Sequence, residues 1–518
     1  MFAGLLLLVA FVFLGGSSSA SDTAKPKKGG TIVVGVDAET PGWDPPDGLI
    51  GLSGRVVMGA IYDSLTAPTP AGDYKPNLAS SVRSRSRNTV WLVTLRRGLR
   101  FQDGTPLNAA AVVHHMQRVI NPRAAVGPGF AYVKEVRAVN ARTVQITLDQ
   151  QRADFPLVLS GPLGQVVSMA GVQRLGTSFR RTPIGAGPYR LVEWVRDDHA
   201  TLQRSTRYYR KNQPYANRVV IRPIPDESAR ASALRAGNLD IMFTQNPTDI
   251  RNFRGNRRIK LIQRQFGTTG LYLHTGKPPL NDLRVRKAIS YALDRTALIK
   301  TVWNGIGRPT NSPFVKGTFW YNRKAERPWD KFNLRQARNL VDAYRRATGR
   351  QPAFRLISRV TQTEQIFKQA LQAQLARAGI QVTIEQVTDD NTYVTRLIRG
   401  EYEGATRLHQ GFLDPVFEMT RLHQKDSFLN IERFSTPDLE RNIQIGLTST
   451  SRRARKRAYD AVQRVLADRV VGIYVRTNTI GIAMKRNIRF NPWRFANRKQ
   501  GLCQEFITII CVDTLSRG

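Results

Sequence analysis

An alternation of strand and helix patterns in the C-terminal half of the chain constrains the fold most strongly. The short runs Phe354–Ile357 and Gln381–Glu385 are typical of strands, and residues 361–378 between them are predicted to form a long helix. A strand–helix–strand unit places its two strands side by side in parallel, with the helix on one face of the sheet. The predicted fold class is therefore α/β.

A second stretch, Asn281–Arg295, predicts an amphipathic helix directly after Leu271–Leu280, an extended segment that meets two prolines. Asn281 or Asp282 can accept backbone N–H groups at the helix start. Taken alone, these residues indicate a helix behind a strand and indicate no function. The apolar positions share one helix face through their three- and four-residue spacing, and they are Val285, Ala288, Ile289, Ala292 and Leu293.

Two further strings combine strands with turn formers. Val90–Asn108 (VWLVTLRRGLRFQDGTPLN) predicts an alternating strand and an Asp-Gly turn, followed by a helix that begins near its last residue. Pro183–Trp194 (PIGAGPYRLVEW) predicts consecutive turns and then a strand. Near the N-terminus, Thr31–Val36 is a β-branched run that predicts a buried strand.

In their order along the chain, these stretches resemble the extracytoplasmic solute-binding proteins of the peptide/nickel type, family 5, of ABC transporters. The string NDLRVRKAISYALDR of the predicted helix carries the resemblance most clearly. The resemblance extends over about residues 29–500. It implies a periplasmic-binding-protein-like fold of two lobes (type II, cluster C) with an extra inserted domain.

The resemblance also implies a division into domains, in which the first lobe is discontinuous in sequence. The expected parts are 29–45, 171–265 and 478–518 for lobe 1, 46–170 for the inserted domain and 266–477 for lobe 2.

The N-terminal segment is expected to direct export. Phe2–Leu14 is almost wholly apolar, and small residues follow it as far as Ala20, which is typical of a secretory signal and its cleavage site. Residues 1–20 are interpreted as a signal segment and residues 21–28 as a polar tether. Since no Lys or Arg precedes the apolar run, an uncleaved anchor is the alternative. The expected location is periplasmic or associated with the cell envelope.

The two cysteines of the sequence, Cys503 and Cys511, lie near its C-terminus. The sequence therefore offers no N-terminal cysteine for a lipid anchor of the kind that many members of the resembled family carry. Two neighbouring cysteines in an exported chain favour a local disulfide. Two free thiols packed as small hydrophobic groups are the alternative.

The charge of the chain is strongly basic: 79 Lys and Arg face 39 Asp and Glu, for a formal net charge of +40 over 518 residues. Such an excess is typical of proteins that contact nucleic acid or another anionic surface. The basic runs, such as Arg452–Arg457, lack interleaved aromatics and fit no helix-turn-helix or zinc pattern, so no nucleic acid partner is expected. A solvated basic surface is the simplest interpretation. The alternative function is an exported scaffold or adhesion protein that binds an anionic envelope polymer.

Catalytic spacings do not occur in the sequence, which has no H-E-x-x-H, G-x-S-x-G or C-x-x-C motif. His114 and His115 are adjacent on a predicted helix and so point in different directions. Asp389 and Asp390 begin another predicted helix, where capping explains them better than paired acid–base chemistry. We therefore expect no enzyme activity, no metal site and no cofactor.

The resemblance places a ligand in a cleft between the lobes, which close over it by a hinge movement. Structural roles are the alternatives: a core position for Tyr272, turns before proline for Asn246 and Asp414, and a hydrogen-bonded histidine for His409. The residues that the resemblance places along this cleft are Leu49, Gly51, Asn246, Tyr272, Arg407, His409 and Asp414.

By the same resemblance, the protein is expected to capture an oligopeptide or a similar small solute and to leave it chemically unaltered. It would deliver this solute, as a monomer, to the permease and ATPase subunits of an ABC importer at the membrane surface. Salt dependence separates this function from the alternative, because binding to a polymer weakens steeply with added salt whereas buried solute binding does not.

Overall fold

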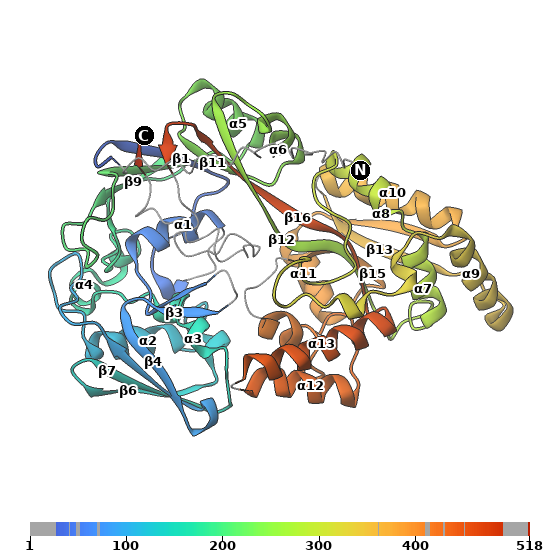
Figure 1. The fold of residues 1–518 in the computed structure, drawn as a ribbon, viewed down its shortest axis with the longest axis horizontal. Helices are drawn as coiled ribbons and strands as arrows, with labels where there is room; N and C mark the ends of the chain where they lie inside the picture. The colour runs from blue at the N-terminus through green and yellow to red at the C-terminus, as the bar shows by residue number, and fades with distance from the viewer. Residues whose placement is uncertain are drawn as a thin grey trace, which may run out of the picture.

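The fold is organised around one large mixed sheet. In the computed structural model its ten strands follow the order β14-β13-β15-β12-β16-β11-β1-β10-β9-β8 (Figure 1). The residues that the structure describes are 27–40, 42–47, 52–69, 73–360, 362–409, 415–427, 430–449, 451–489 and 516–517.

One side of this sheet contains the strand–helix–strand unit predicted from the sequence. β13 (Ala353–Arg359) and β14 (Gln381–Val387) pair in parallel, and α10 (Gln362–Arg377) connects them. β15 (Gly404–His409) pairs with the other edge of β13, also in parallel. The predicted α/β fold class is confirmed.

The other side of the sheet is built on β1 (Thr31–Val36), whose bounds match the β-branched run in the sequence. β1 lies between two parallel neighbours, β10 (Arg218–Pro223) and β11 (Ile241–Thr244). The antiparallel strands β9 (His199–Arg204) and β8 (Tyr189–Val195) complete the sheet beyond β10. Alternate side chains of these strands enter one shared apolar core.

Two long strands join the two sides of the sheet. β12 (Ile259–Leu273) and β16 (Gly472–Lys485) pair antiparallel over almost their whole length, and the pair runs diagonally across the molecule in Figure 1. β15 pairs with the last residues of β12, and β11 pairs with the last residues of β16. The two lobes are therefore parts of one hydrogen-bonded sheet.

The predicted amphipathic helix is α7 (Leu283–Ala292), in the lobe that contains β13. The side chain of Asp282 accepts the backbone N–H of Arg284, which assigns the predicted N-cap to Asp282. The guanidinium group of Arg286 donates hydrogen bonds to carbonyl oxygens at the C-terminal end of α13 (Arg452–Arg469). The helix thus packs its apolar face in the core, and the side chain of Arg286 hydrogen-bonds it to the end of α13.

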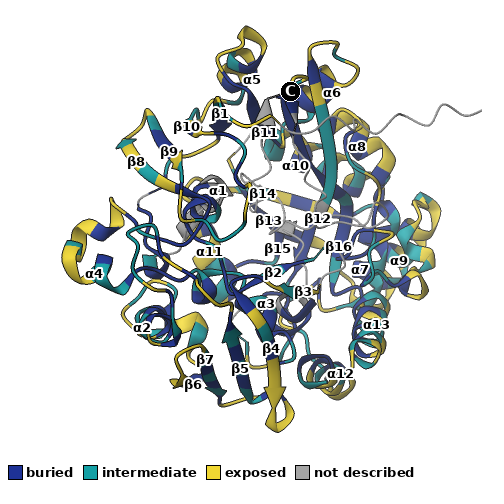
Figure 2. Ribbon diagram, turned by 60° about the vertical axis from the view of Figure 1, so that its left-hand side comes forward, coloured by how far each residue is buried: buried dark blue, intermediate teal, exposed yellow. Residues whose placement is uncertain are grey.

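Helices cover both faces of the sheet in this lobe. Leu356 of β13 packs in a core with α7, α8, α9 and α10, whereas the next residue, Ile357, packs with α11 on the opposite face. In Figure 2 the central strands carry buried residues, and the exposed residues lie on outer elements such as α4 and α5. The other helical elements here are α8 (Arg295–Trp303), α9 (Leu334–Thr348), α11 (Asp390–Arg399), α12 (Pro437–Thr448) and a π-helical segment, Val416–Arg421.

A separate four-stranded antiparallel sheet packs under α2 (Ala109–Ile120) and has its own apolar core. The helix begins where the sequence predicts, because the side chain of Asn108 accepts the backbone N–H of Ala111. The strand order is β4 (Ala79–Arg85), β5 (Val90–Leu95), β7 (Thr143–Leu148) and β6 (Val133–Asn140).

The shorter elements connect these layers, and none of the helices in the described ranges has both the length and the apolar character needed to cross a membrane. They are α1 (Leu52–Ile61), α3 (Phe155–Val158), α4 (Met169–Leu175), α5 (Glu227–Ala236), α6 (Pro247–Phe253), β2 (Thr66–Pro68), β3 (Tyr74–Pro76), β17 (Ile488–Arg489) and β18 (Ser516–Arg517).

The close approach of the crossing strands yields a prediction for Gly270. A Cβ atom at this position would lie 1.8 Å from the carbonyl oxygen of Ile473 on β16, so Gly270→Ala must push the two strands apart. We expect a loss of about 2–3 kcal/mol in the free energy of unfolding, measured by urea denaturation. Gly129→Ala is the control, because its Cβ would have no atom within 4 Å. Equal stability of the two variants would contradict the prediction.

Candidate functional site

The direction of the strands indicates where a ligand can bind. β15 pairs antiparallel with β12, so that its last residue, His409, lies opposite Thr268 in the middle of the crossing pair, and its first residue lies opposite the far end of β12. In the other lobe, Thr244 at the end of β11 pairs with Gly481 and so also points toward the middle of the molecule. The carboxyl ends of the parallel strands of both lobes therefore face the region between the lobes. Open α/β sheets bind ligands at such carboxyl ends.

The strand end of the first lobe carries a network of polar side chains around Asn246. Its side-chain oxygen accepts the backbone N–H groups of Thr248 and Asp249 and caps α6, and its Nδ2 donates to Glu227 at 2.6 Å. Asp249 accepts a hydrogen bond from Thr244 at 3.2 Å, and burial raises the pKa of its carboxyl group. The predicted site residue Asn246 thus lies at the strand end, with its amide group engaged in helix capping.

The strand end of the second lobe carries charged groups that sequence analysis missed. Arg359 is the last residue of β13, and its guanidinium group lies 4.7 Å from the ring centre of Tyr393. Glu364 and Lys368 follow on the first two turns of α10. Burial raises the pKa of the Glu364 carboxyl group, which is hydrogen-bonded to Thr406, and burial lowers the pKa of the Lys368 ammonium group. Two cations and one carboxylate thus gather at this edge.

Because ligands bind at the carboxyl ends of strands in open α/β sheets, the sequence marks these residues as candidates, although it does not show which region their strand end faces. Arg359 follows the predicted strand Phe354–Ile357, and Glu364 falls in the first turn of the predicted helix after it. The resemblance instead placed Arg407, His409 and Asp414 of the second lobe along the cleft. The missing information was the orientation of β13 relative to the first lobe, which only the pairing of β15 with β12 supplies.

Polar side chains are buried where the crossing strands pass between the lobes. Thr269 on β12 donates a hydrogen bond from its Oγ1 to the side-chain oxygen of Asn478 on β16, at 2.5 Å. The pairing register of β12 shifts between Phe266 and Thr268 and again between Thr269 and Gly270. An irregular ladder bends more readily than a regular one. The interruption therefore lies where a hinge between the lobes is needed.

The remaining predicted site residues fall into three groups. Tyr272 is 8% exposed and packs in the apolar cluster around α11, as its alternative core role predicts. On β15 the backbone of Arg407 pairs with Gly270 and that of His409 with Thr268, which places both positions beside the crossing strands. Their roles in binding stay predictions. Leu49, Gly51 and Asp414, the cysteines Cys503 and Cys511, and residues 1–26 lie outside the described residues.

The second lobe also meets the four-stranded sheet, away from the crossing strands, where this sheet approaches α12 and α13 (Figure 1). The backbone N–H of Ala153 donates to the carbonyl oxygen of Leu447 at 3.1 Å, and the Nδ2 of Asn88 donates to that of Thr448 at 3.3 Å. A cavity of about 250 Å³ lies beside these bonds. The two halves are thus held together on both sides of the interlobe region.

Two α/β lobes that share crossing strands and direct their carboxyl ends at one another define a two-lobe solute-binding protein. The sequence model described as "Bacterial extracellular solute-binding proteins, family 5 Middle" matches residues 73–427, which is more than half of the chain. The chain belongs to this family of bacterial extracellular solute-binding proteins, as the sequence motifs predicted.

Individual relatives match most of the length of the chain, and a solved structure shares its fold. The chain is 24% identical over 445 residues to the probable D,D-dipeptide-binding periplasmic protein DdpA of Escherichia coli K12, covering 81% of this chain and 83% of that protein. It is 26% identical over 380 residues to the glutathione-binding protein GsiB of the same strain, covering 73% of each. The solved structure of HbpA2 from Haemophilus parasuis has a TM-score of 0.81 at 18% identity, covering 94% of this chain and 100% of that one.

Family membership confirms the two-lobe fold and the general function predicted from the sequence. The protein is a solute-binding component of an ABC importer, works with permease and ATPase components, and is not an enzyme. The curated relatives named above are periplasmic or solute-binding proteins.

The second contact between the lobes leads to a prediction about closure. Asn88 has a positive φ, which glycine also adopts, so Asn88→Gly removes the side-chain bond to Thr448 without backbone strain. Loss of one such bond costs about 1 kcal/mol, and we expect the dissociation constant for a bound solute to rise about fivefold. Small-angle scattering is expected to show a larger radius of gyration for the variant.

Asn212→Gly is the matched control for this experiment. Asn212 also has a positive φ, and its side chain accepts a hydrogen bond from the Nζ of Lys28, which is far in sequence from the second lobe. An equal rise in dissociation constant for both variants would show that the contact between Asn88 and Thr448 does not favour closure.

Proposed function

We propose that the solute is an oligopeptide or a similar small molecule that carries both charges, and that it binds between the two lobes. The observation that carries the proposal is the arrangement of charged groups at strand ends that face one another across this region. Carboxylates Glu227 and Asp249 lie near the strand ends of the first lobe, and cations Arg359 and Lys368 at those of the second. The peptide ligands named for DdpA and GsiB support the same class.

The groups of the second lobe suit the carboxylate end of a peptide. A guanidinium group presents its donors in a planar fork that matches a carboxylate, and such charge-assisted bonds are short and strong. Arg359 is held against the ring of Tyr393, whose hydroxyl donates to the carbonyl oxygen of Thr406 at 2.5 Å. The side chain is thus oriented before a ligand arrives, and less conformational entropy is lost on binding.

The residues expected from the resemblance complete the proposed site. Closure about the irregular part of the crossing strands would bring the two strand ends onto the ligand and remove water from it. The protein would remain a monomer, and its closed form would dock on the permease of its importer at the membrane surface. The additional contacts that we propose are Leu49, Gly51, Asn246, Tyr272, Arg407, His409 and Asp414.

Peptides with and without a charged C-terminus test this function. A panel of di- to pentapeptides is expected to include members that raise the melting temperature of the protein. For those members, Arg359→Ala is expected to weaken binding about 10- to 100-fold, because one charge-assisted bond is lost. A C-terminal amide on the same peptide is expected to weaken binding by a similar factor, and the two changes are not expected to add. Isothermal titration calorimetry measures all four combinations.

Arg355→Ala is the control, since Arg355 lies on the same strand and pairs with Glu385 at 3.2 Å instead of occupying the strand end. If no peptide raises the melting temperature while another class of solute does, the peptide assignment is wrong. If peptides bind but Arg359→Ala and Arg355→Ala have equal effects, the role of Arg359 is wrong.

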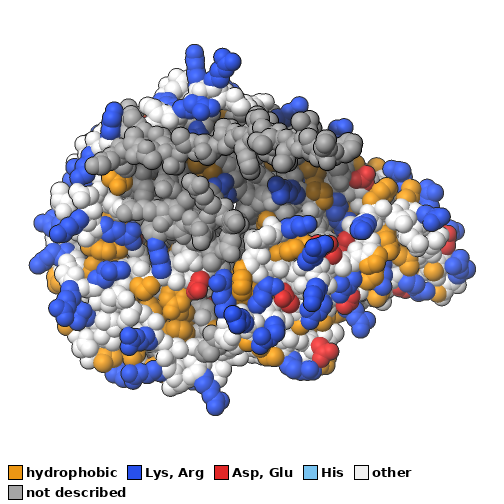
Figure 3. All heavy atoms as spheres, in the orientation of Figure 1, with side chains coloured by type: hydrophobic (Ala, Val, Ile, Leu, Met, Phe, Trp, Pro, Cys, Tyr) orange, Lys and Arg blue, Asp and Glu red, His pale blue; other side chains and the backbone are white. Residues whose placement is uncertain are grey.

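The net charge supports a second, additional function, which is weak adhesion to an anionic envelope polymer. Lys and Arg side chains are spread over the described part of the face seen in Figure 3, where they outnumber the acidic side chains. With poly-L-glutamate as the probe, we expect retention at about 50 mM salt and release by about 500 mM, because salt screens exposed charges. Binding of a peptide between the lobes is expected to change little over this range. Retention that is independent of salt would exclude this function.

A further inference from the structure

A cavity of about 780 Å³ opens in the second lobe between the end of α7 and the start of α9. Its lining residues all fall between Tyr291 and Gln336, so they come from one lobe and include none of the strand ends that face the other. Organic ligands of moderate size occupy pockets of roughly 300–1,000 Å³. We name this cavity the lobe 2 cup.

Arg295 and Asp330 form a polar side of the lobe 2 cup, which we call its floor. Arg295 is 6% exposed and donates to the carbonyl oxygens of Tyr474 at 2.8 Å and of Asp330 at 3.0 Å. The Asp330 carboxylate accepts hydrogen bonds from the side chain of Asn311 and, at 2.6 Å, from the backbone N–H of Arg327. Both charged groups are thus hydrogen-bonded within the protein, and the floor is formed without a ligand.

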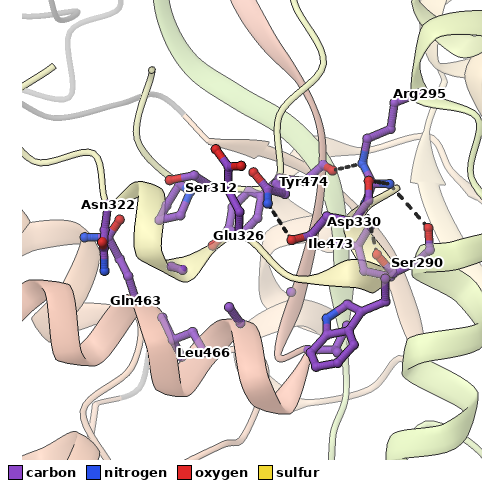
Figure 4. A pocket seen from close by; sticks show the side chains of 17 residues that line it. Ser290, Arg295, Ser312, Asn322, Glu326, Asp330, Gln463, Leu466, Ile473 and Tyr474 are labelled. Carbon is purple, nitrogen blue, oxygen red and sulfur yellow. Dashed lines mark hydrogen bonds between the residues drawn. The ribbon is translucent and has the colours of Figure 1, made fainter. Parts of the chain in front are cut away.

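A smaller space of about 30 Å³ adjoins the lobe 2 cup and shares Arg295, Asn311, Glu326 and Asp330 with it. Figure 4 shows this smaller space, with Arg295, Glu326 and Asp330 labelled. Its far wall comes from α13 and β16, including Gln463 and Tyr474. This space is too small for an organic ligand. The binding volume is therefore the outer cup.

The rim of the lobe 2 cup is positively charged. Glu326 accepts a hydrogen bond from the hydroxyl group of Tyr321, and Arg327 pairs with Asp468 at 2.5 Å. These two charged groups therefore already have partners within the protein. In contrast, Lys316 and Lys331 line the cup, and within the described part of the chain neither ammonium group has a carboxylate at ion-pair distance. The charge that the cup offers to a ligand is therefore positive.

Aromatic side chains also line the lobe 2 cup. Tyr291, Tyr321 and Phe332 line the cup, and Phe332 is 44% exposed although it is a large apolar side chain. Exposed aromatic faces next to cations suit a planar ring that carries an anionic group, since the ring covers apolar surface and the anion pairs with the ammonium groups.

We propose that the lobe 2 cup is a second binding site, which takes a small organic anion with an aromatic body, such as an aryl carboxylate. The carboxylate lies between Lys316 and Lys331, and the ring lies against Phe332. Because the cup is built from one lobe, this site does not depend on closure and is independent of the solute that binds between the lobes.

Titration of the full chain with 2-naphthoate and with neutral 2-naphthamide tests the proposal. We expect naphthoate to bind with a stoichiometry of one and about five- to tenfold more tightly than the amide, because two exposed ion pairs contribute about 1 kcal/mol together. The double variant Lys316→Ala, Lys331→Ala is expected to lower the affinity for naphthoate to that for the amide. Phe332→Ala is expected to weaken both ligands.

Lys260→Ala, Lys300→Ala is the matched control, because both lysines are exposed and neither lines the lobe 2 cup. Naphthoate binding is expected to be unchanged in this control and in Arg359→Ala. A crystal structure with the carboxylate between Lys316 and Lys331 would support the proposal directly.

Three results would overturn the proposal. The first is the lack of saturable naphthoate binding at concentrations on the order of 1 mM. The second is equal binding by the double lysine variant and its control. The third is loss of naphthoate binding in Arg359→Ala, which would place the anion between the lobes. The peptide proposal is tested separately, by the titrations with peptides.

Discussion

The antiparallel pairing of β12 with β16 is the constraint on which the rest of the structure depends. Because each of these strands continues from one lobe into the other, their register fixes how both halves of the sheet are oriented. β15 and β11 take their directions from this pair, and the parallel strands beside them follow. The carboxyl ends of both lobes face each other for this reason alone. The same ladder is interrupted near Thr268, so the regular pairing is broken where the strands pass between the lobes.

Arginine contributes to this structure from the inside as well as on the surface. The buried guanidinium groups of Arg230, Arg286 and Arg295 donate mainly to backbone carbonyl oxygens, in strands β11 and β16, in connecting segments and at the C-terminus of α13. A guanidinium group has five donors in fixed directions and can satisfy several carbonyl groups at once. Part of the basic excess therefore satisfies backbone carbonyl groups inside the protein and is not available to an external partner.

Local signals in the sequence were sufficient for much of the fold. The strand Thr31–Val36, the cap at Asn108 and the unit from Phe354 to Glu385 depend on residues close together in the chain, and the structure contains all of them. The register of β12 with β16 depends on residues about two hundred positions apart, and no local pattern encodes it. For that reason sequence analysis missed Arg359. For Tyr272 the sequence left a core role and a ligand contact both open, since strand periodicity does not say which face of the sheet a helix will cover.

Whether a ligand contacts one lobe or both lobes decides whether its binding can change the shape that the importer meets. A ligand shifts the balance between open and closed forms only by as much as its affinity differs between them. A solute that touches both strand ends gains contacts on closure, so its binding is coupled to the shape that the permease meets. An anion in the lobe 2 cup would contact residues from Tyr291 to Gln336 only, all of which belong to one lobe. Occupancy of the cup therefore leaves the closure equilibrium unchanged unless the bound molecule extends beyond the rim.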